Sequence, residues 1–134
     1  MSRVQLALNV TDLDEAVAYY SKLFGVEPAK RQPGYANYAI AEPPLKLVLF
    51  ESGQPGGTLN HLGVEVESTD EVAATQRRLT DEGVETTGED KVDCCYALQD
   101  KVWATGPDGE RWEIYTVLAD TSATTSSPPS TCCT

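Results

Sequence analysis

Two stretches of the chain, residues 4–10 and 60–66, alternate between apolar and polar side chains, which predicts a half-buried strand in each. Gln5 opens the polar face of the first stretch, and His61 opens the same face of the second. The apolar faces should pack beneath helices, and they consist of Leu6, Leu8 and Val10 in the first stretch and Leu62, Val64 and Val66 in the second.

A helix is expected after each of these strands. Asp12 and Ser68 each precede a glutamate by three residues, which is the capping-box pattern of a helix N-terminus. Apolar residues at helical spacing follow, and Gly25 and Gly83 are placed to end the two helices.

Each half then continues with strand patterns. Extended chain restarts after each glycine, at residues 26–27 and 84–85. An Asp-Gly turn joins the last two strands of the second half, as is typical of a hairpin. The sequence therefore predicts the order β-α-β-β-β twice, with the later strands at residues 35–41 and 45–50 and at residues 101–105 and 111–118.

This repeat predicts an α+β fold in which two βαβββ modules share one domain, since half a domain of this size would hardly hold a core alone. The domain should span residues 1–118, with module one at 1–52 and module two at 59–118. Residues 119–134 are rich in Ser, Thr and Pro, end in cysteines, and are expected to be disordered. The helices should cover one face of the sheets and leave the other face concave.

Composition and charge exclude several classes of function. The 134 residues carry a formal net charge of −11, which disfavours nucleic acid and anionic membranes as partners. No apolar run is long enough to span a bilayer, and the N-terminus has no secretory core. We therefore expect a soluble cytoplasmic protein, as a monomer or a homodimer.

Three polar side chains should meet on the concave face. Gln5 and His61 occupy equivalent positions of the repeat, and His61 is the only histidine of the chain. Glu113 lies in the last strand, where Trp112 and Ile114 suit the packed face and Glu113 the opposite one. Each residue alone could be an ordinary polar side chain without a metal role. Together, an amide oxygen, an imidazole and a carboxylate suit Fe(II), Mn(II) or Co(II), with Ni(II) and Zn(II) not excluded.

The 4 cysteines form two adjacent pairs, Cys94-Cys95 and Cys132-Cys133. Neighbouring α-carbons are about 3.8 Å apart, too close for an unstrained disulfide, so free vicinal thiols are expected. Thiolates suit a thiophilic partner such as trivalent arsenic or cadmium. Cys94 and Cys95 can meet one atom only if they lie in a loop, which Gly88 and the charged run after it favour. The tail pair could pass on arsenic or be inert.

The paired modules, the histidine that opens module two and the segment Pro107-Asp108-Gly109-Glu110-Arg111-Trp112-Glu113 resemble the vicinal oxygen chelate superfamily of glyoxalases, extradiol dioxygenases and fosfomycin and bleomycin resistance proteins. The resemblance covers residues 3–118 and implies metal ligands at Gln5, His61 and Glu113. A fourth ligand of some members would fall at Val48, which cannot ligate, so a three-ligand site is expected.

Within that superfamily, Cys94-Cys95 and the residues around them, from Asp93 to Trp103, resemble the organoarsenical carbon–arsenic lyases of the ArsI type. This resemblance implies an Fe(II)- and dioxygen-dependent enzyme that converts trivalent methyl and aromatic arsenicals to arsenite. It also implies that Cys94 and Cys95 bind the arsenical while Gln5, His61 and Glu113 hold the metal. The alternatives are a non-catalytic binding protein for cadmium or arsenic, and a thiol-transfer enzyme of the fosfomycin type, which this acidic chain suits poorly.

Overall fold

The computed structural model describes residues 2–94 and 97–120, which divide into two units, with the boundary between Asn60 and His61. The predicted order β-α-β-β-β, repeated once, is confirmed. The first half contains β1 (Arg3–Asn9), α1 (Leu13–Phe24), β2 (Lys30–Gln32), β3 (Tyr35–Ile40) and β4 (Leu45–Phe50). The second half contains β5 (Leu59–Glu65), α2 (Thr69–Asp81), β6 (Thr87–Cys94), β7 (Ala97–Thr105) and β8 (Arg111–Asp120).

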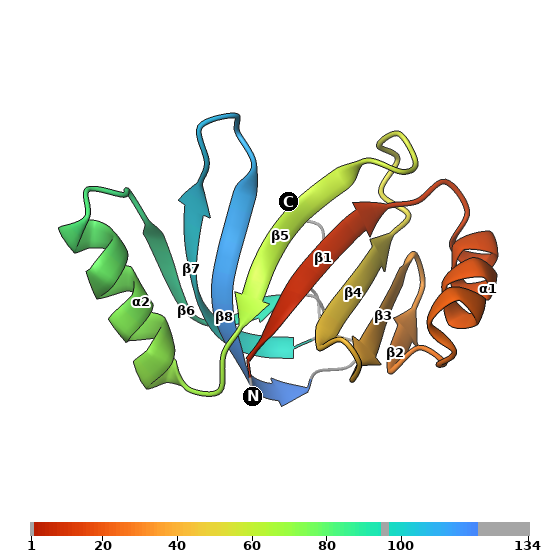
Figure 1. Cartoon of the computed structure of the whole chain (residues 1–134), viewed down its shortest axis with the longest axis horizontal. Helices are drawn as coiled ribbons and strands as arrows, with labels where there is room; N and C mark the ends of the chain where they lie inside the picture. The colour runs from red at the N-terminus through yellow and green to blue at the C-terminus, as the bar shows by residue number, and fades with distance from the viewer. Residues whose placement is uncertain (1, 95–96, 121–134) are drawn as a thin grey trace. The chain divides into compact units, whose positions relative to one another are not determined.

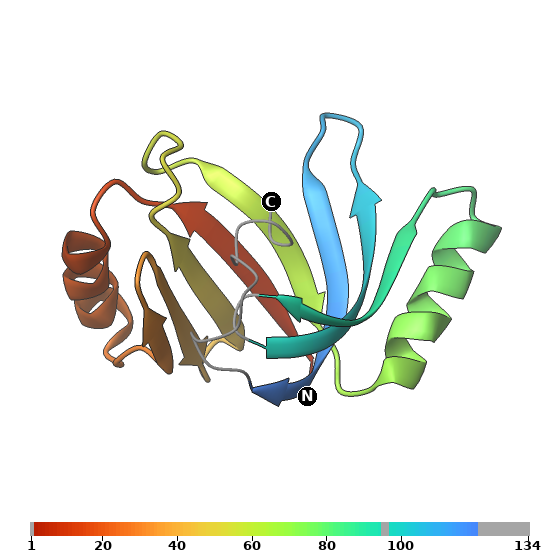
Figure 2. The ribbon, with the colours of Figure 1, turned by 180° about the vertical axis from the view of Figure 1, so that it is seen from behind.

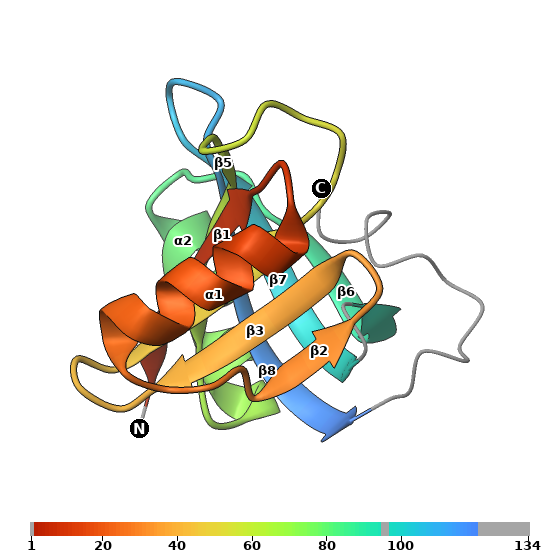
Figure 3. The ribbon, with the colours of Figure 1, turned by 90° about the vertical axis from the view of Figure 1, so that its right-hand side faces the viewer.

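In the first unit, α1 lies against one face of a sheet with the strand order β2-β3-β4-β1 (Figures 1 and 3). The helix begins where Asp12 accepts a hydrogen bond from the backbone N–H of Glu15, and it ends at Gly25, whose φ of 69° suits glycine. Its inner side packs on the apolar residues that the alternation of β1 assigned to this face, Leu6, Leu8 and Val10, together with buried residues of β3 and β4.

In the second unit, the strand order is β5-β8-β7-β6, and α2 packs against β7 and β8 (Figure 2). Ser68 caps α2 by accepting a hydrogen bond from the N–H of Glu71, as predicted. β8 is parallel to β5 and antiparallel to β7. This pairing places residues of β5, β7 and β8 next to one another although they are far apart in the sequence.

The two halves share one strand register. In the first, Ala7 of β1 pairs with Val48 of β4; in the second, Gly63 of β5 pairs with Glu113 of β8. Both pairs are parallel. Val48 is therefore the counterpart of Glu113, which is the equivalence that the sequence analysis used to locate the missing fourth ligand.

The expectation of a loop before the cysteines is wrong for residues 88–94. They belong to β6, which pairs with β7 from Thr87↔Trp103 to Cys94↔Ala97. A bulge interrupts the pairing between Glu89 and Val92 and holds Lys91 at a φ of 52°. Pairing with β7 imposes extended backbone on a stretch whose glycine and aspartates have little intrinsic preference for strands.

The ends of the described chain bear on two further predictions. β8 continues to Asp120, two residues beyond the expected end of the last strand, and the expected disordered tail with Cys132 and Cys133 lies outside the described residues from position 121. Within the described part of the chain, neither helix combines the length and the hydropathy that crossing a bilayer requires.

Candidate metal centre

His61 and Glu113 form a buried pair in the second unit. His61 lies in β5 and Glu113 in the neighbouring strand β8, and their side chains approach because β5 and β8 are parallel partners. His61 Nε2 is 2.7 Å from Glu113 Oε2, and the two residues are 1% and 2% exposed. The contact confirms neither a metal nor a catalytic role, but it brings together two of the three predicted ligands.

Lys101 of β7 completes this group, and the sequence analysis did not identify it. Its Nζ donates a hydrogen bond of 2.8 Å to Glu113 Oε1, and the residue is 2% exposed. The ammonium also lies 5.5 Å from the ring centre of Trp103 and 5.9 Å from that of Tyr115. Each carboxylate oxygen of Glu113 therefore has its own nitrogen partner, Oε1 with Lys101 and Oε2 with His61.

These partners keep Glu113 ionised. Burial by itself raises the pKa of this carboxyl, but the hydrogen bond from His61 and the charge of Lys101 outweigh burial and lower its pKa from 4.5 to about 2. Because the carboxylate only accepts hydrogen bonds, His61 Nε2 carries the proton in this contact. A carboxylate that is already ionised costs no proton release when it binds a cation.

The pair fits a divalent cation. Nitrogen and oxygen ligands lie about 2.0–2.2 Å from such an ion, so adjacent ligands at right angles are about 3.0 Å apart. The observed 2.7 Å between Nε2 and Oε2 is short of that by only a few tenths of an ångström, and an ion would replace the Nε2 proton. Over the residues that the structure describes, no cluster of three His, Cys, Asp or Glu side chains is present.

Gln5 is the residue that the sequence predicts as a third ligand. It lies in β1 of the first unit, where it pairs with Lys46 of β4 and is 4% exposed. A buried amide at this position agrees with the predicted orientation of β1, whose polar face is turned away from α1. Joint coordination by Gln5, His61 and Glu113 stays a prediction.

Cys94 and Cys95 cannot be placed in the same way. The backbone of Cys94 ends β6 opposite Ala97, whereas its side chain and the whole of Cys95 lie outside the described residues. The role of the two thiols in binding substrate therefore stays a prediction.

Trp103 was also missed as a site residue. It lies two residues from Lys101 along β7, so the two side chains leave the strand on the same face. Its ring packs edge-on against His61, with 5.4 Å between the ring centres. Its indole N–H donates a hydrogen bond of 2.8 Å to Glu89 Oε1, and the guanidinium carbon of Arg111 lies 4.1 Å from its ring centre. Trp103 therefore separates the buried pair from charged residues nearer to solvent.

Comparison with solved structures finds the same fold at low sequence identity. The catechol 2,3-dioxygenase structure matches 92% of this chain and 43% of its own, with a TM-score of 0.64 and 21% identity. The Mn(II)-bound glyoxalase of Novosphingobium aromaticivorans matches 95% of this chain and 44% of its own, with a TM-score of 0.63 and 19% identity. These likenesses confirm the predicted fold class.

Comparison with known sequences identifies closer relatives. Cadmium-induced protein CadI of Mycobacterium tuberculosis is 64% identical over 96% of this chain and 84% of its own length. The trivalent organoarsenical cleaving enzyme of Thermomonospora curvata is 56% identical over 100% of this chain and 89% of its own, and that of a Bacillus species is 39% identical over 99% and 83%. The family profile matches residues 3–114. As its two βαβββ modules predicted, the chain belongs to the Glyoxalase/Bleomycin resistance protein/Dioxygenase superfamily.

Proposed function

We propose that this protein cleaves the carbon–arsenic bond of trivalent organoarsenicals, with Fe(II) and dioxygen, and releases arsenite. The observation that carries the proposal is the 56% identity, along the whole chain, to a protein named trivalent organoarsenical cleaving enzyme. For methylarsenite the balanced reaction is CH3As(OH)2 + O2 → As(OH)3 + CH2O. The methyl carbon loses the electrons that dioxygen gains, and arsenic stays trivalent.

Gln5, His61 and Glu113 would hold the metal, and bound Fe(II) would supply the site at which dioxygen is activated. Glu113 brings a full negative charge, because its pKa is about 2. Lys101 engages Oε1 of Glu113 and so presents Oε2, on the side of His61, as the ligand atom. The burial of His61 and Glu113 keeps bulk water away from the reacting groups.

Cys94 and Cys95 would bind the arsenical as a dithiolate. Trivalent arsenic is thiophilic, and two adjacent sulfurs hold it while one position keeps the organic group. Such binding would place the carbon–arsenic bond near the metal and replace a bimolecular encounter by an intramolecular one. Free thiols require a reducing compartment, so we place the protein in the cytoplasm.

The test starts with reduced protein loaded with Fe(II) and methylarsenite without oxygen. Arsenic speciation should show no arsenite until oxygen is admitted. Afterwards, arsenite and formaldehyde should be formed in equal amounts, with formaldehyde measured by a separate assay. Cys94→Ser/Cys95→Ser should lose turnover but keep iron, and His61→Ala should lose iron. Cys132→Ser/Cys133→Ser is the matched control for thiol loss and should keep activity. Arsenite production by protein without iron would refute the proposal.

A second candidate function is the sequestration of thiophilic metals without catalysis. It is favoured by the 64% identity to a protein named for its induction by cadmium. The same experiment separates the two, since a sequestering protein binds methylarsenite tightly and releases no arsenite after oxygen is admitted. Its affinity for Cd²⁺ would also depend on both cysteine pairs, whereas the enzyme needs only Cys94 and Cys95.

A further inference from the structure

A buried lysine lies beside one of the proposed metal ligands. Lys101 Nζ is 2.8 Å from Glu113 Oε1, and both residues are 2% exposed. An ammonium group that leaves water for such a site loses its hydration, at a cost that only a close partner of opposite charge can offset. A neutral donor, such as a side-chain amide, would hold Oε1 in place at a lower cost. The charge of Lys101, rather than its hydrogen bond, therefore needs an explanation.

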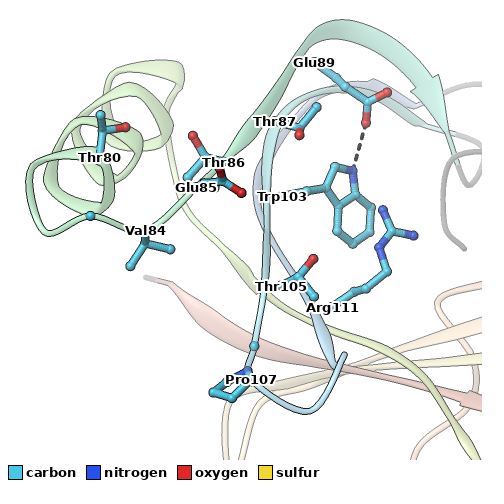
Figure 4. Close-up of a pocket in the computed structure, with 12 residues that line it drawn as sticks. Thr80, Val84, Glu85, Thr86, Thr87, Glu89, Trp103, Thr105, Pro107 and Arg111 are labelled. Carbon is cyan, nitrogen blue, oxygen red and sulfur yellow. Dashed lines mark hydrogen bonds between the residues drawn. The ribbon is translucent and has the colours of Figure 1, made fainter.

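The surroundings of Lys101 hold its ammonium group away from solvent. Its Nζ lies 5.5 Å from the ring centre of Trp103 and 5.9 Å from that of Tyr115, within the range of cation–π contacts. Trp103 is itself held by a hydrogen bond to Glu89 and by the Arg111 guanidinium, 4.1 Å from its ring centre (Figure 4). These two charged residues line an open hollow of about 1410 Å³, so solvent screens their charges. The buried charge of Lys101 is screened much less.

The charge of Lys101 balances that of the proposed ligand set. Gln5 and His61 are neutral when they bind a metal, whereas Glu113 carries one negative charge. Because Lys101 adds one positive charge, the whole group has a net charge of zero instead of −1. A bound divalent ion then leaves two uncompensated positive charges at a buried pair of ligands, and a trivalent ion leaves three. Lys101 therefore opposes a trivalent ion more strongly than a divalent one.

We infer that Lys101 selects the ferrous over the ferric state of bound iron, because its buried charge opposes a third positive charge on the metal. The proposed reaction needs Fe(II), and dioxygen can also oxidise that ion without turnover. In this side reaction the iron loses one electron and becomes Fe(III), while dioxygen accepts the electron and becomes superoxide. Lys101 acts through Glu113, so it is a positioning residue. The inference rests on the proposed function, because it takes Glu113 to be an iron ligand.

The test measures the reduction potential of the bound iron, which does not depend on turnover. Protein loaded with Fe(II) without oxygen or arsenical is poised at a series of potentials, and its ferric iron is measured by electron paramagnetic resonance. For two unit charges roughly 6 Å apart, at an effective dielectric constant of about 20, the interaction corresponds to a factor of roughly 100 in an equilibrium constant. Water near the loaded site weakens the interaction, so Lys101→Met should favour Fe(III) over Fe(II) by about tenfold or more. At about 59 mV per tenfold change for one electron, its potential should fall by about 60 mV or more.

Two further variants separate the charge of Lys101 from its hydrogen bond. Lys101→Gln can still donate to Oε1 but has no charge, so its potential should fall as in Lys101→Met. Lys101→Arg keeps the charge and should keep the wild-type potential. Lys22→Met is the matched control, because it removes the same charge from an exposed position of α1, and it should leave the potential unchanged. If Lys101→Met does not fold, Lys101→Gln gives the same comparison.

Three results would overturn the inference. The first is a change of less than about twofold, or about 20 mV, in both uncharged variants of Lys101. The second is an equal fall in Lys22→Met, which would reflect the net charge of the protein. The third is an equal fall in Lys101→Arg, which would reflect the hydrogen-bond geometry and not the charge.

These outcomes are distinguishable from failure of the proposed function. If the potential depends on the charge of Lys101 but no arsenite forms from methylarsenite, the inference stands and the enzyme proposal fails. If arsenite forms and the potential does not respond, the inference alone is wrong. A wild type that binds no iron would refute both.

Discussion

Replacement of Lys101 by methionine removes one charge from the most deeply buried ionic group of the second unit. Methionine has nearly the volume and shape of the lysine stem, so packing around the side chain is largely kept. What is lost is the hydrogen bond of 2.8 Å to Glu113 Oε1 and the positive charge beside that carboxylate. The variant therefore isolates the electrostatic role of Lys101.

The structure sets the size of the effect. Lys101 and Glu113 are each 2% exposed, and removal of one partner from a buried ion pair costs about 3–5 kcal/mol. Because Glu113 keeps its hydrogen bond from His61, the lower end applies. We expect Lys101→Met to lower the free energy of unfolding of the metal-free protein by about 3 kcal/mol, or its Tm by roughly 10 °C.

Urea unfolding of metal-free protein measures this loss of stability. A double-mutant cycle with Glu113→Gln shows how much of it comes from the Lys101–Glu113 interaction. Each single variant removes one member of the Lys101–Glu113 ion pair and leaves the other charge buried, whereas the double variant removes both charges. The double variant should therefore be more stable than the sum of the two losses implies, by about 2–3 kcal/mol.

Lys101→Met should bind divalent cations more tightly than the wild type, although it is less stable without metal. Lys101 repels a cation at Oε2, so its removal should strengthen Co²⁺ or Fe²⁺ binding by about tenfold or more, whereas Lys101→Arg should not. Additive losses in the cycle would refute the buried ion pair, and weaker metal binding by Lys101→Met would refute Glu113 as a ligand beside it.

Three further predictions follow from individual residues. His61→Ala should weaken Co²⁺ binding about 100-fold or more in an equilibrium titration, because it removes one of three proposed ligands. Lys91→Gly should stabilise the protein by up to about 1 kcal/mol in urea unfolding, since the φ of 52° is strained for lysine and not for glycine. The lowered pKa of Glu113 stabilises metal-free protein fully above pH 4.5, and this contribution is lost as the pH falls toward 2. The difference in urea midpoint between wild type and Glu113→Gln should therefore shrink from pH 6 to pH 3.

The sequence predicted those parts of the fold that local patterns determine. The caps at Asp12 and Ser68 and the alternation in β1 and β5 depend on neighbouring residues, so they could be recognised without a structure. β6 was not recognised, because its extended form depends on pairing with β7 and not on the strand preference of its own residues.

The candidate site shows the same limit. His61 and Glu113 were predicted from their orientations within strands, and the structure brings them into contact. Lys101 was missed because a lysine in a strand ordinarily faces solvent, and only the carboxylate of a neighbouring strand explains its burial. Trp103 was missed because an aromatic residue in a strand is ordinarily a core residue.

The shared register of Ala7↔Val48 and Gly63↔Glu113 carries an evolutionary consequence. Two halves that agree in element order and in pairing are what duplication and fusion of an ancestral half-length gene would leave. The two copies have since diverged in sequence. The C-terminal copy contains His61 and Glu113, and the N-terminal copy has Val48 at the position equivalent to Glu113. In the proposed ligand set, the N-terminal copy contributes one ligand, the amide of Gln5, and the C-terminal copy contributes two.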